Sequence, residues 1–177
     1  MSLRRPHKHP FEEPIRRSLW LCACTLVRPL KAHGHLARNP NILKIKNPKK
    51  IMMDVYTNWC GPCKMLDKYT FQNEDVVAYV NEHYYAVKFN AEGDEVINFF
   101  DQKFINSNYD PNKKGRNSTH QFTRFLKVEG YPTIVFFSEE GDPIIPLTGY
   151  FNVRQIEPYL KMIKRGDYAI FKDSDDL

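Results

Sequence analysis

The stretch Trp59-Cys60-Gly61-Pro62-Cys63-Lys64 places two thiols with two residues between them in a chain of 177 residues. Residues 51–56 come shortly before it and are apolar apart from Asp54, which favours a buried strand. Helix-forming residues follow without a breaker, and Pro62 falls in the first turn, where its missing N–H is harmless. Cys60 is therefore predicted at a helix N-terminus, where free N–H groups and the helix dipole stabilise a thiolate.

This spacing of thiols suits disulfide exchange, in which a thiolate attacks a disulfide and a second thiol resolves the mixed disulfide. We expect Cys60 to be the exposed attacking thiol and Cys63, one turn further in, to be the buried resolving thiol. Asp54 could accept the proton of Cys63, because burial in an apolar strand raises the pKa of a carboxyl group towards neutral pH. The alternative is that Asp54 is a strand-end carboxylate in solvent or in a plain ion pair.

A Cys-x-x-Cys pair can also be half of a zinc site. A structural zinc site usually has a second close pair of ligands. Residues 64–177 contain no further cysteine, and their only histidines, His83 and His120, are far apart in sequence. The Gly-Pro pair between the thiols also favours a helix start over a metal-binding turn. We therefore expect a redox pair at this site, with no metal and no bound cofactor.

Charge separates the first fifty residues from the rest of the chain. Residues 1–50 hold 12 Lys/Arg against 2 Asp/Glu, a net charge of +10, whereas residues 51–177 hold 14 against 19, a net charge of −5. We interpret residues 1–49 as a basic leader or linker, either an export signal or non-native sequence. Residues 50–165 are expected to form one domain, and residues 166–177 an acidic tail.

The leader has features of a signal peptide. Arg16-Arg17 precede the mostly apolar run 18–27, which is too short to span a membrane. Because histidines in a basic, Pro-containing leader are more often solvated, we expect no metal on its three pairs of zinc or copper ligands, His7/His9, Cys22/Cys24 and His33/His35. Its basic charge lacks interleaved aromatic residues, so we expect no nucleic-acid partner.

The pattern beyond the two thiols predicts further helices and strands. Asn73 and Asn152 are the expected N-caps of two of the helices. The predicted helices are at 73–82, 94–104, 119–128 and 152–164, and the predicted strands at 84–90, 133–137 and 143–149.

Residues 94–118 carry two separate expectations. Phe99, Phe100 and Phe104 lie at helical spacing and are expected in the core rather than in a ligand site. Residues 105–118 are polar and rich in turn residues, which predicts a long insertion. The insertion is either a solvated surface loop or a segment that reaches towards a partner.

Taken together, these residues resemble the thioredoxin superfamily. The sequence at 59–64 is the thioredoxin active-site sequence, and Asp54 matches the buried carboxylate of that family. Gly130-Tyr131-Pro132-Thr133 resembles its cis-proline loop, and Gly141 and Gly149 fit the turn and the strand end of its last hairpin. The resemblance implies an α/β thioredoxin fold, with a central mixed sheet flanked by helices and a polar insertion before the cis-proline loop.

A closer resemblance is to the C-terminal, periplasmic domain of the thiol:disulfide interchange protein DsbD and to the free-standing relatives of that domain. It extends over residues 50–164. Asp54-Val55-Tyr56, Trp59-Cys60 and Lys68-Tyr69-Thr70-Phe71 carry it, in that order, before a Val-rich helix.

The resemblance implies roles for residues around the two thiols. The catalytic residues would be Cys60, Cys63 and Asp54. The residues that bind substrate would be Trp59, Gly61, Pro62, Tyr131 and Pro132. The peptide bond before Pro132 would be cis, so that Tyr131 offers its backbone to the substrate chain. The supporting residues would be Lys88, near Asp54, and Lys64.

The predicted function is that of a thiol–disulfide oxidoreductase that reduces or isomerises protein disulfides. A Gly-Pro interior implies a reducing potential, nearer the ~−270 mV of thioredoxin than the ~−120 mV of DsbA. The expected partners are protein clients and an upstream electron donor. We expect a monomer without a stable membrane span, in the bacterial periplasm or cell envelope.

Two alternatives to this function stay open. One is a general cytoplasmic thioredoxin. The other is a thioredoxin-fold binding or chaperone module that recognises partners without turnover. The presence of both Cys60 and Cys63 argues against the second, because a binding module has no need of a resolving thiol.

Overall fold

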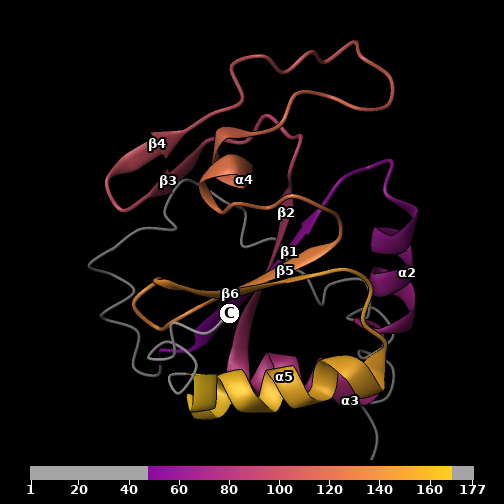
Figure 1. Ribbon diagram of the computed structural model, residues 1–177, viewed down its shortest axis with the longest axis vertical. Helices are drawn as coiled ribbons and strands as arrows, with labels where there is room; N and C mark the ends of the chain where they lie inside the picture. The colour runs from indigo at the N-terminus through magenta and orange to yellow at the C-terminus, as the bar shows by residue number, and fades with distance from the viewer. Residues whose placement is uncertain (1–47, 169–177) are drawn as a thin grey trace, which may run out of the picture.

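The computed structural model of the chain describes residues 48–168 (Figure 1). The expectations for the leader, its metal-ligand pairs and most of the acidic tail lie outside the described residues. Within them, no helix is long and apolar enough to cross a membrane. The elements follow in the order β1 (Lys50–Tyr56), α2 (Gly61–Tyr69), α3 (Glu74–His83), β2 (Tyr84–Asn90), β3 (Ile97–Phe99), β4 (Gln102–Phe104), α4 (Gln121–Phe125), β5 (Thr133–Phe137), β6 (Pro143–Thr148) and α5 (Val153–Arg165).

Four strands form a mixed sheet in the order β2-β1-β5-β6. β1 is parallel to β2 and antiparallel to β5, and β6 is antiparallel to β5. In this register Asp54 of β1 lies beside Lys88 of β2 on one side and Ile134 of β5 on the other. The mixed sheet with its flanking helices confirms the predicted α/β architecture.

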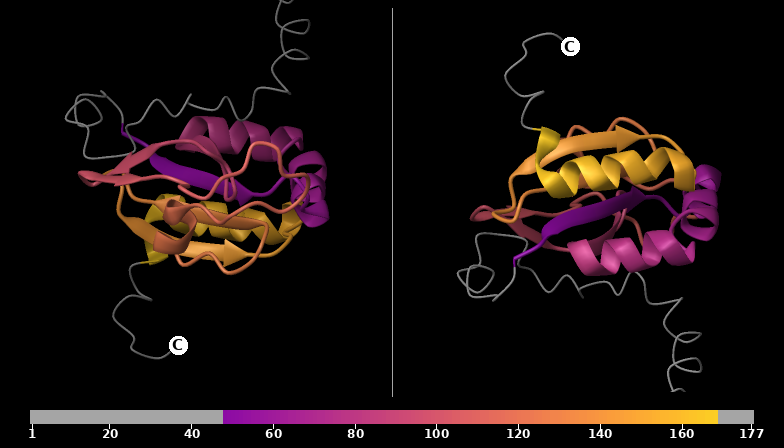
Figure 2. Two further views of the ribbon diagram at one scale, coloured as in Figure 1. Left: turned by 90° about the horizontal axis from the view of Figure 1, so that it is seen from above. Right: turned by 90° about the horizontal axis from the view of Figure 1, so that it is seen from below.

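Alternate residues of the strands supply two cores, one on each face of the sheet. α3 and α5 lie side by side on one face, as the right-hand view of Figure 2 shows. The core on that face includes Met52, Val80, Ile134, Phe136 and Leu160. The β3–β4 hairpin and α4 cover the other face, where the core includes Met53, Phe89, Phe99, Phe122 and Phe137. Asp54 shares the strand face of Met52, so its side chain is directed towards the α3 side.

The helix predicted at 94–104 is wrong, because this segment forms the β3–β4 hairpin. Ile97 and Phe99 are buried with Asn98 less so between them, which is the period of two of a strand. Phe100 and Asp101 make the turn with φ values of 47° and 63°, and a turn with two left-handed residues matches the twist of a hairpin. The predicted core position is confirmed for Phe99 and Phe104.

The helix predicted at 119–128 is also too long, because α4 covers only Gln121–Phe125. The Nδ1 atom of His120 accepts a hydrogen bond from the Phe122 backbone N–H at 3.0 Å and caps the helix N-terminus. Lys127 has a φ of 54°, which ends helical geometry soon after Phe125.

The remaining predicted elements agree with the structure to within one residue at each end. The two predicted caps are confirmed. Asn73 accepts from the backbone N–H groups of Asp75 and Val76, and Asn152 forms a capping box with Gln155.

The insertion, residues 105–118, connects β4 to α4 and extends furthest from α5 (Figure 1). Its two ends are tied together by Asn106, whose side-chain N–H groups donate to the carbonyls of Gly93 and Ser118 at 2.9 and 2.8 Å. Further out, Asn117 and Asp110 exchange two hydrogen bonds of 2.8 and 3.1 Å. The insertion therefore has a defined course that its own side chains fix.

Candidate active site

Cys60 and Cys63 are joined by a disulfide across the first turn of α2. Cys60 is the N-cap of the helix, and its Sγ accepts a hydrogen bond from the Cys63 backbone N–H at 3.1 Å. Pro62 falls within the first turn. The predicted helix start is confirmed, and a free N–H group of the helix points at the Cys60 sulfur.

The expected contrast in exposure between the two thiols is not present. Cys60 is 3% exposed and Cys63 is 4% exposed, so the prediction of an exposed Cys60 is wrong for the disulfide form. In this form the Cys60 sulfur lies against the first turn of α2, where it is bonded to the Cys63 sulfur and accepts from the Cys63 N–H. Side-chain burial therefore does not distinguish the attacking from the resolving thiol.

Asp54 is a buried carboxyl group without a hydrogen-bond donor. It is 2% exposed, and neither of its oxygens has a hydrogen-bond partner among residues 48–168. It borders a cavity of about 10 Å³ that is otherwise lined by apolar side chains, including those of Met52, Phe71 and Val80. Burial raises its pKa from 3.8 to about 7, although Lys88 acts in the opposite direction. This environment differs from both the solvent-exposed carboxylate and the plain ion pair considered from the sequence.

Lys88 lies near Asp54, as expected, but is held mainly by a second carboxylate. Its Nζ is 4.0 Å from Asp54 Oδ2 and 2.9 Å from Asp67 Oδ1. Asp67 raises the pKa of Asp54 further, by its own negative charge. The sequence reasoning missed Asp67. Its signal was available, because Asp67 follows Cys63 by four residues and so lies on the same face of α2.

The loop before β5 approaches the active-site tryptophan. The Tyr131–Pro132 peptide bond is cis, and the Tyr131 ring meets the Trp59 ring edge-on with centroids 6.0 Å apart. The Pro132 carbonyl accepts from the Gly149 N–H at 2.8 Å, and Thr133 Oγ1 donates to the Gly130 carbonyl at 2.8 Å. Tyr131 thus lies beside Trp59, the residue that directly precedes Cys60, although the two rings are more than seventy positions apart in sequence.

Trp59 also has partners on the side of the insertion, and the sequence reasoning missed all of them. Its Nε1–H donates to Glu92 Oε2 at 2.9 Å, and the same oxygen accepts from the Asn117 backbone N–H at 2.8 Å. The Arg116 guanidinium lies over the Trp59 ring, 4.2 Å from its centroid. No local signal in the sequence pairs residue 59 with residues 92, 116 and 117, because only the course of the insertion brings them together.

The other predicted site residues lie at the surface. Gly61, Pro62 and Lys64 are exposed, and Lys64 makes no ion pair within residues 48–168. Lys64 is therefore not drawn into the group formed by Lys88 and the two aspartates. In the same part of the chain, no three His, Cys, Asp or Glu side chains are grouped as metal ligands.

Known proteins resemble this chain in both sequence and fold. The DsbD thiol:disulfide interchange protein of Pectobacterium atrosepticum is 27% identical over 118 residues, which cover 66% of this chain and 17% of that protein. The DsbD of Citrobacter koseri is 29% identical over 115 residues, or 64% of this chain and 16% of that protein. The chain thus spans less than a fifth of the length of these two relatives.

The fold has a solved counterpart. A thioredoxin-fold protein from Helicobacter pylori superposes with a TM-score of 0.57 at 22% identity, over 86% of this chain and 87% of that chain. The family profile described as a thioredoxin-like domain matches residues 41–164, which include the disulfide, Asp54 and the cis-proline loop. This chain belongs to the thioredoxin-like domain family.

Proposed function

We propose that this chain is a thiol–disulfide oxidoreductase that reduces or isomerises disulfides of client proteins through Cys60 and Cys63. One observation carries the proposal. The two sulfurs are bonded across the N-terminus of α2, in a domain whose buried Asp54 has a pKa of about 7 and no hydrogen-bond donor among residues 48–168. The likeness to DsbD supports the same chemistry.

In the first step, the reduced Cys60 attacks one sulfur of a client disulfide as a thiolate. A bond forms between Cys60 and that sulfur, the client disulfide breaks, and the second client sulfur leaves as a thiolate that takes a proton from water. The Cys63 N–H that donates to Cys60 Sγ, together with the α2 dipole, stabilises the attacking thiolate. Tyr131, Pro132 and Trp59 form the surface against which the client chain lies.

In the second step, Cys63 releases the client. Its thiol gives a proton to Asp54, and the resulting thiolate attacks Cys60 Sγ. The Cys60–client bond breaks, the remaining client sulfur leaves as a thiolate, and the Cys60–Cys63 disulfide forms. The client has gained two electrons, and Asp54 returns its proton to water. A partner dithiol must then supply two electrons to reduce the disulfide again.

In isomerisation the second step is replaced by attack of another client thiol on the mixed disulfide, so that Cys60 is released without net oxidation.

We also propose that the domain acts in the bacterial periplasm or cell envelope. Support comes from the resemblance to the DsbD domain and from the Arg16-Arg17 pair before the apolar run 18–27. Cell fractionation together with N-terminal sequencing of the native protein tests this. A mature protein that begins after residue 27 and leaves the cytoplasm agrees with the proposal, and an intact leader on a cytoplasmic protein contradicts it.

The oxidoreductase proposal is tested with two matched variants, Cys60→Ser and Cys63→Ser, in insulin reduction and in trapping of clients. Cys63→Ser should accumulate mixed disulfides, because Cys60 attacks but is not released. Cys60→Ser should abolish both trapping and insulin reduction. Trapping by Cys60→Ser but not by Cys63→Ser would reverse the two roles. A wild-type protein that binds clients but never reduces insulin would favour the binding module without turnover.

A further inference from the structure

The insertion is held against the active-site tryptophan by a buried carboxylate. Glu92 is 9% exposed, and its Oε2 accepts from both Trp59 Nε1–H and the Asn117 N–H. Trp59 directly precedes Cys60, and Asn117 lies near the C-terminal end of the insertion. One oxygen thus fixes the insertion beside the residue next to the attacking sulfur.

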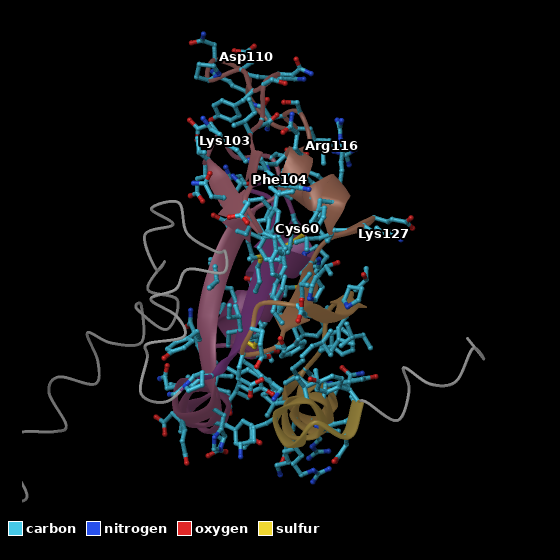
Figure 3. All side chains as sticks on the ribbon, turned by 90° about the vertical axis from the view of Figure 1, so that its left-hand side faces the viewer. Cys60, Lys103, Phe104, Asp110, Arg116 and Lys127 are labelled. Atoms are coloured by element: carbon cyan, nitrogen blue, oxygen red, sulfur yellow. A yellow bond between two sulfur atoms is a disulfide. The ribbon has the colours of Figure 1, made fainter. Side chains whose placement is uncertain are left out.

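Arg116, next to Asn117 in the insertion, also contacts Trp59. Its guanidinium lies over the Trp59 ring at 4.2 Å, within the range of a cation–π interaction. The Trp59 ring also meets the ring of Tyr131, next to the cis proline, edge-on. Figure 3 shows Arg116 between the far end of the insertion, at Asp110, and Cys60. Arg116, Trp59 and Tyr131 therefore form a continuous surface from the insertion to the cis-proline loop.

The outer part of the insertion is basic in a domain that is otherwise acidic. Lys113, Lys114 and Arg116 are all exposed, and none forms an ion pair within residues 48–168. Asp110 is the only acidic residue of the insertion, and its carboxylate accepts from the Asn112 N–H. The insertion therefore has a net charge of +2, whereas residues 51–177 have a net charge of −5.

We infer that Lys113, Lys114 and Arg116, here called the basic rim, form a client-binding surface beside Cys60 that selects extended segments with carboxylates near their disulfide. This inference rests on the proposed oxidoreductase function and adds the chemistry of the preferred client. Because the rim spans three peptide units, its length is at most about 10 Å. An extended client segment of about three residues can therefore lie along the rim.

Two acidic side chains close in sequence to Glu92 restrict where an acidic client can bind. Asp94 and Glu95 are exposed and lie between Glu92 and β3. A client carboxylate next to them would be repelled, so the preference for acidic clients requires that the client lie against the basic rim. The rival explanation is that the insertion only supports Trp59 and leaves client choice unaffected by charge.

Binding without chemistry separates these explanations. The probes are two extended peptides that differ only in flanking residues, Glu in one and Lys in the other, with the client cysteine replaced by serine. Binding to the full-length protein is measured by NMR chemical-shift titration. The test variant is Lys113→Gln/Lys114→Gln/Arg116→Gln. The control is Arg154→Gln/Lys161→Gln/Lys164→Gln, which makes the same charge change on α5, at the far end of the molecule from the insertion (Figure 1).

We expect wild type to bind the Glu peptide about tenfold more tightly than the Lys peptide at low salt, since each rim charge contributes modestly. The ratio should fall to within about twofold in the rim variant, remain in the control, and decrease with added salt in wild type. Equal affinities in wild type, or an equal loss of the ratio in the control, would overturn the inference.

A turnover experiment distinguishes this inference from the function on which it rests. The same two sequences are prepared with their cysteine restored and joined by a disulfide to one common partner peptide, and kcat/KM for reduction is measured for each. A selective wild type should show a preference in kcat/KM that follows the binding ratio. Selective binding without reduction of either peptide would disprove the oxidoreductase proposal and leave the rim assignment standing. Reduction of both peptides at equal kcat/KM, with equal binding, would disprove the rim assignment alone.

Discussion

Two buried carboxylates near the active site have opposite surroundings. Asp54, in β1, is 2% exposed and receives no hydrogen bond among the described residues. Glu92, two residues after β2, is 9% exposed and accepts two N–H donors on one oxygen. The two carboxyl groups are similarly buried, but only that of Glu92 accepts hydrogen bonds.

The difference suits the two buried acids to different purposes. A buried carboxylate without donors is driven towards its neutral form, and the pKa of Asp54 is accordingly raised to about 7. Such a group can take and return a proton at physiological pH. A carboxylate that accepts hydrogen bonds from fixed donors is suited to hold structure, and Glu92 joins Trp59 to the insertion. The predictions below test this contrast.

The largest effect is expected from Asp54→Asn on release of the mixed disulfide. If Asp54 takes the Cys63 proton, the resolution rate near neutral pH should fall about 100- to 10,000-fold, the usual range for loss of a general base. The initial attack by Cys60 should change little. Rapid-quench measurement of mixed-disulfide formation and decay separates the two steps. Equal slowing of both steps, or loss of the fold, would mean that Asp54 is structural.

The same substitution should change how stability depends on pH. The folded-state pKa of about 7 lies above the ordinary 3.8, so folded Asp54 holds a proton that the unfolded chain releases. The contribution of protonated Asp54 to the stability of wild type is therefore fully present below about pH 4. It is lost as the pH rises from about 4 through 7. Between pH 4 and 8, the free energy of unfolding of Asp54→Asn relative to wild type should rise by on the order of 3–4 kcal/mol.

Denaturant unfolding of the oxidised proteins measures this difference without interference from thiol titration. A relative free energy that stays flat from pH 4 to 8 would show that Asp54 ionises in the folded protein as readily as in the unfolded chain.

Substitution of Glu92 should lower, rather than raise, the free energy of unfolding at pH 7. Glu92→Ala leaves Trp59 Nε1–H and the Asn117 N–H without their acceptor, which should lower the free energy of unfolding by about 1–2 kcal/mol at pH 7. Glu92→Gln keeps an acceptor oxygen and should lower it less. Tryptophan fluorescence should also change in Glu92→Ala, because the indole loses its partner. A stabilising effect of either substitution at pH 7 would remove the contrast with Asp54.

The smallest effect is expected from Asp67, through Lys88. In Asp67→Asn, Lys88 loses its 2.9 Å partner and can move towards Asp54, which should lower the pKa of Asp54 below about 7. The midpoint of the pH profile of resolution should move down by about half a pH unit. Lys88→Gln should move it up, because the lysine stabilises the Asp54 carboxylate. Shifts in the same direction would show that the ion pairs do not set this pKa.

The redox centre was predictable because its signals are local. The helix start at Cys60 follows from Pro62 and from the apolar strand before it, and the caps Asn73 and Asn152 were identified by residue type. The burial of Asp54 follows from its apolar neighbours in one strand. Each of these inferences involves residues a few positions apart, where backbone geometry leaves few alternatives.

The errors arose where spacing alone was ambiguous. Phe99, Phe100 and Phe104 are compatible with a helical stripe, but the observed hairpin buries Ile97, Phe99 and Phe104 against one face of the sheet. Tertiary packing decided between the two periods, because the segment gains more from covering that face as a hairpin than from its own helical preference. The burial of Cys60 likewise did not follow from its position at the helix start.

The sequence by itself determined that two thiols lie at the start of a helix, after a strand with one buried acid, in an α/β domain. Only the tertiary structure decided what surrounds them. It placed Glu92, Arg116 and Asn117 around Trp59. The physical reason is that periodicity and capping act within a few residues of the chain. The pairing of a carboxylate with donors on distant segments depends on how loops pack, which no local pattern encodes.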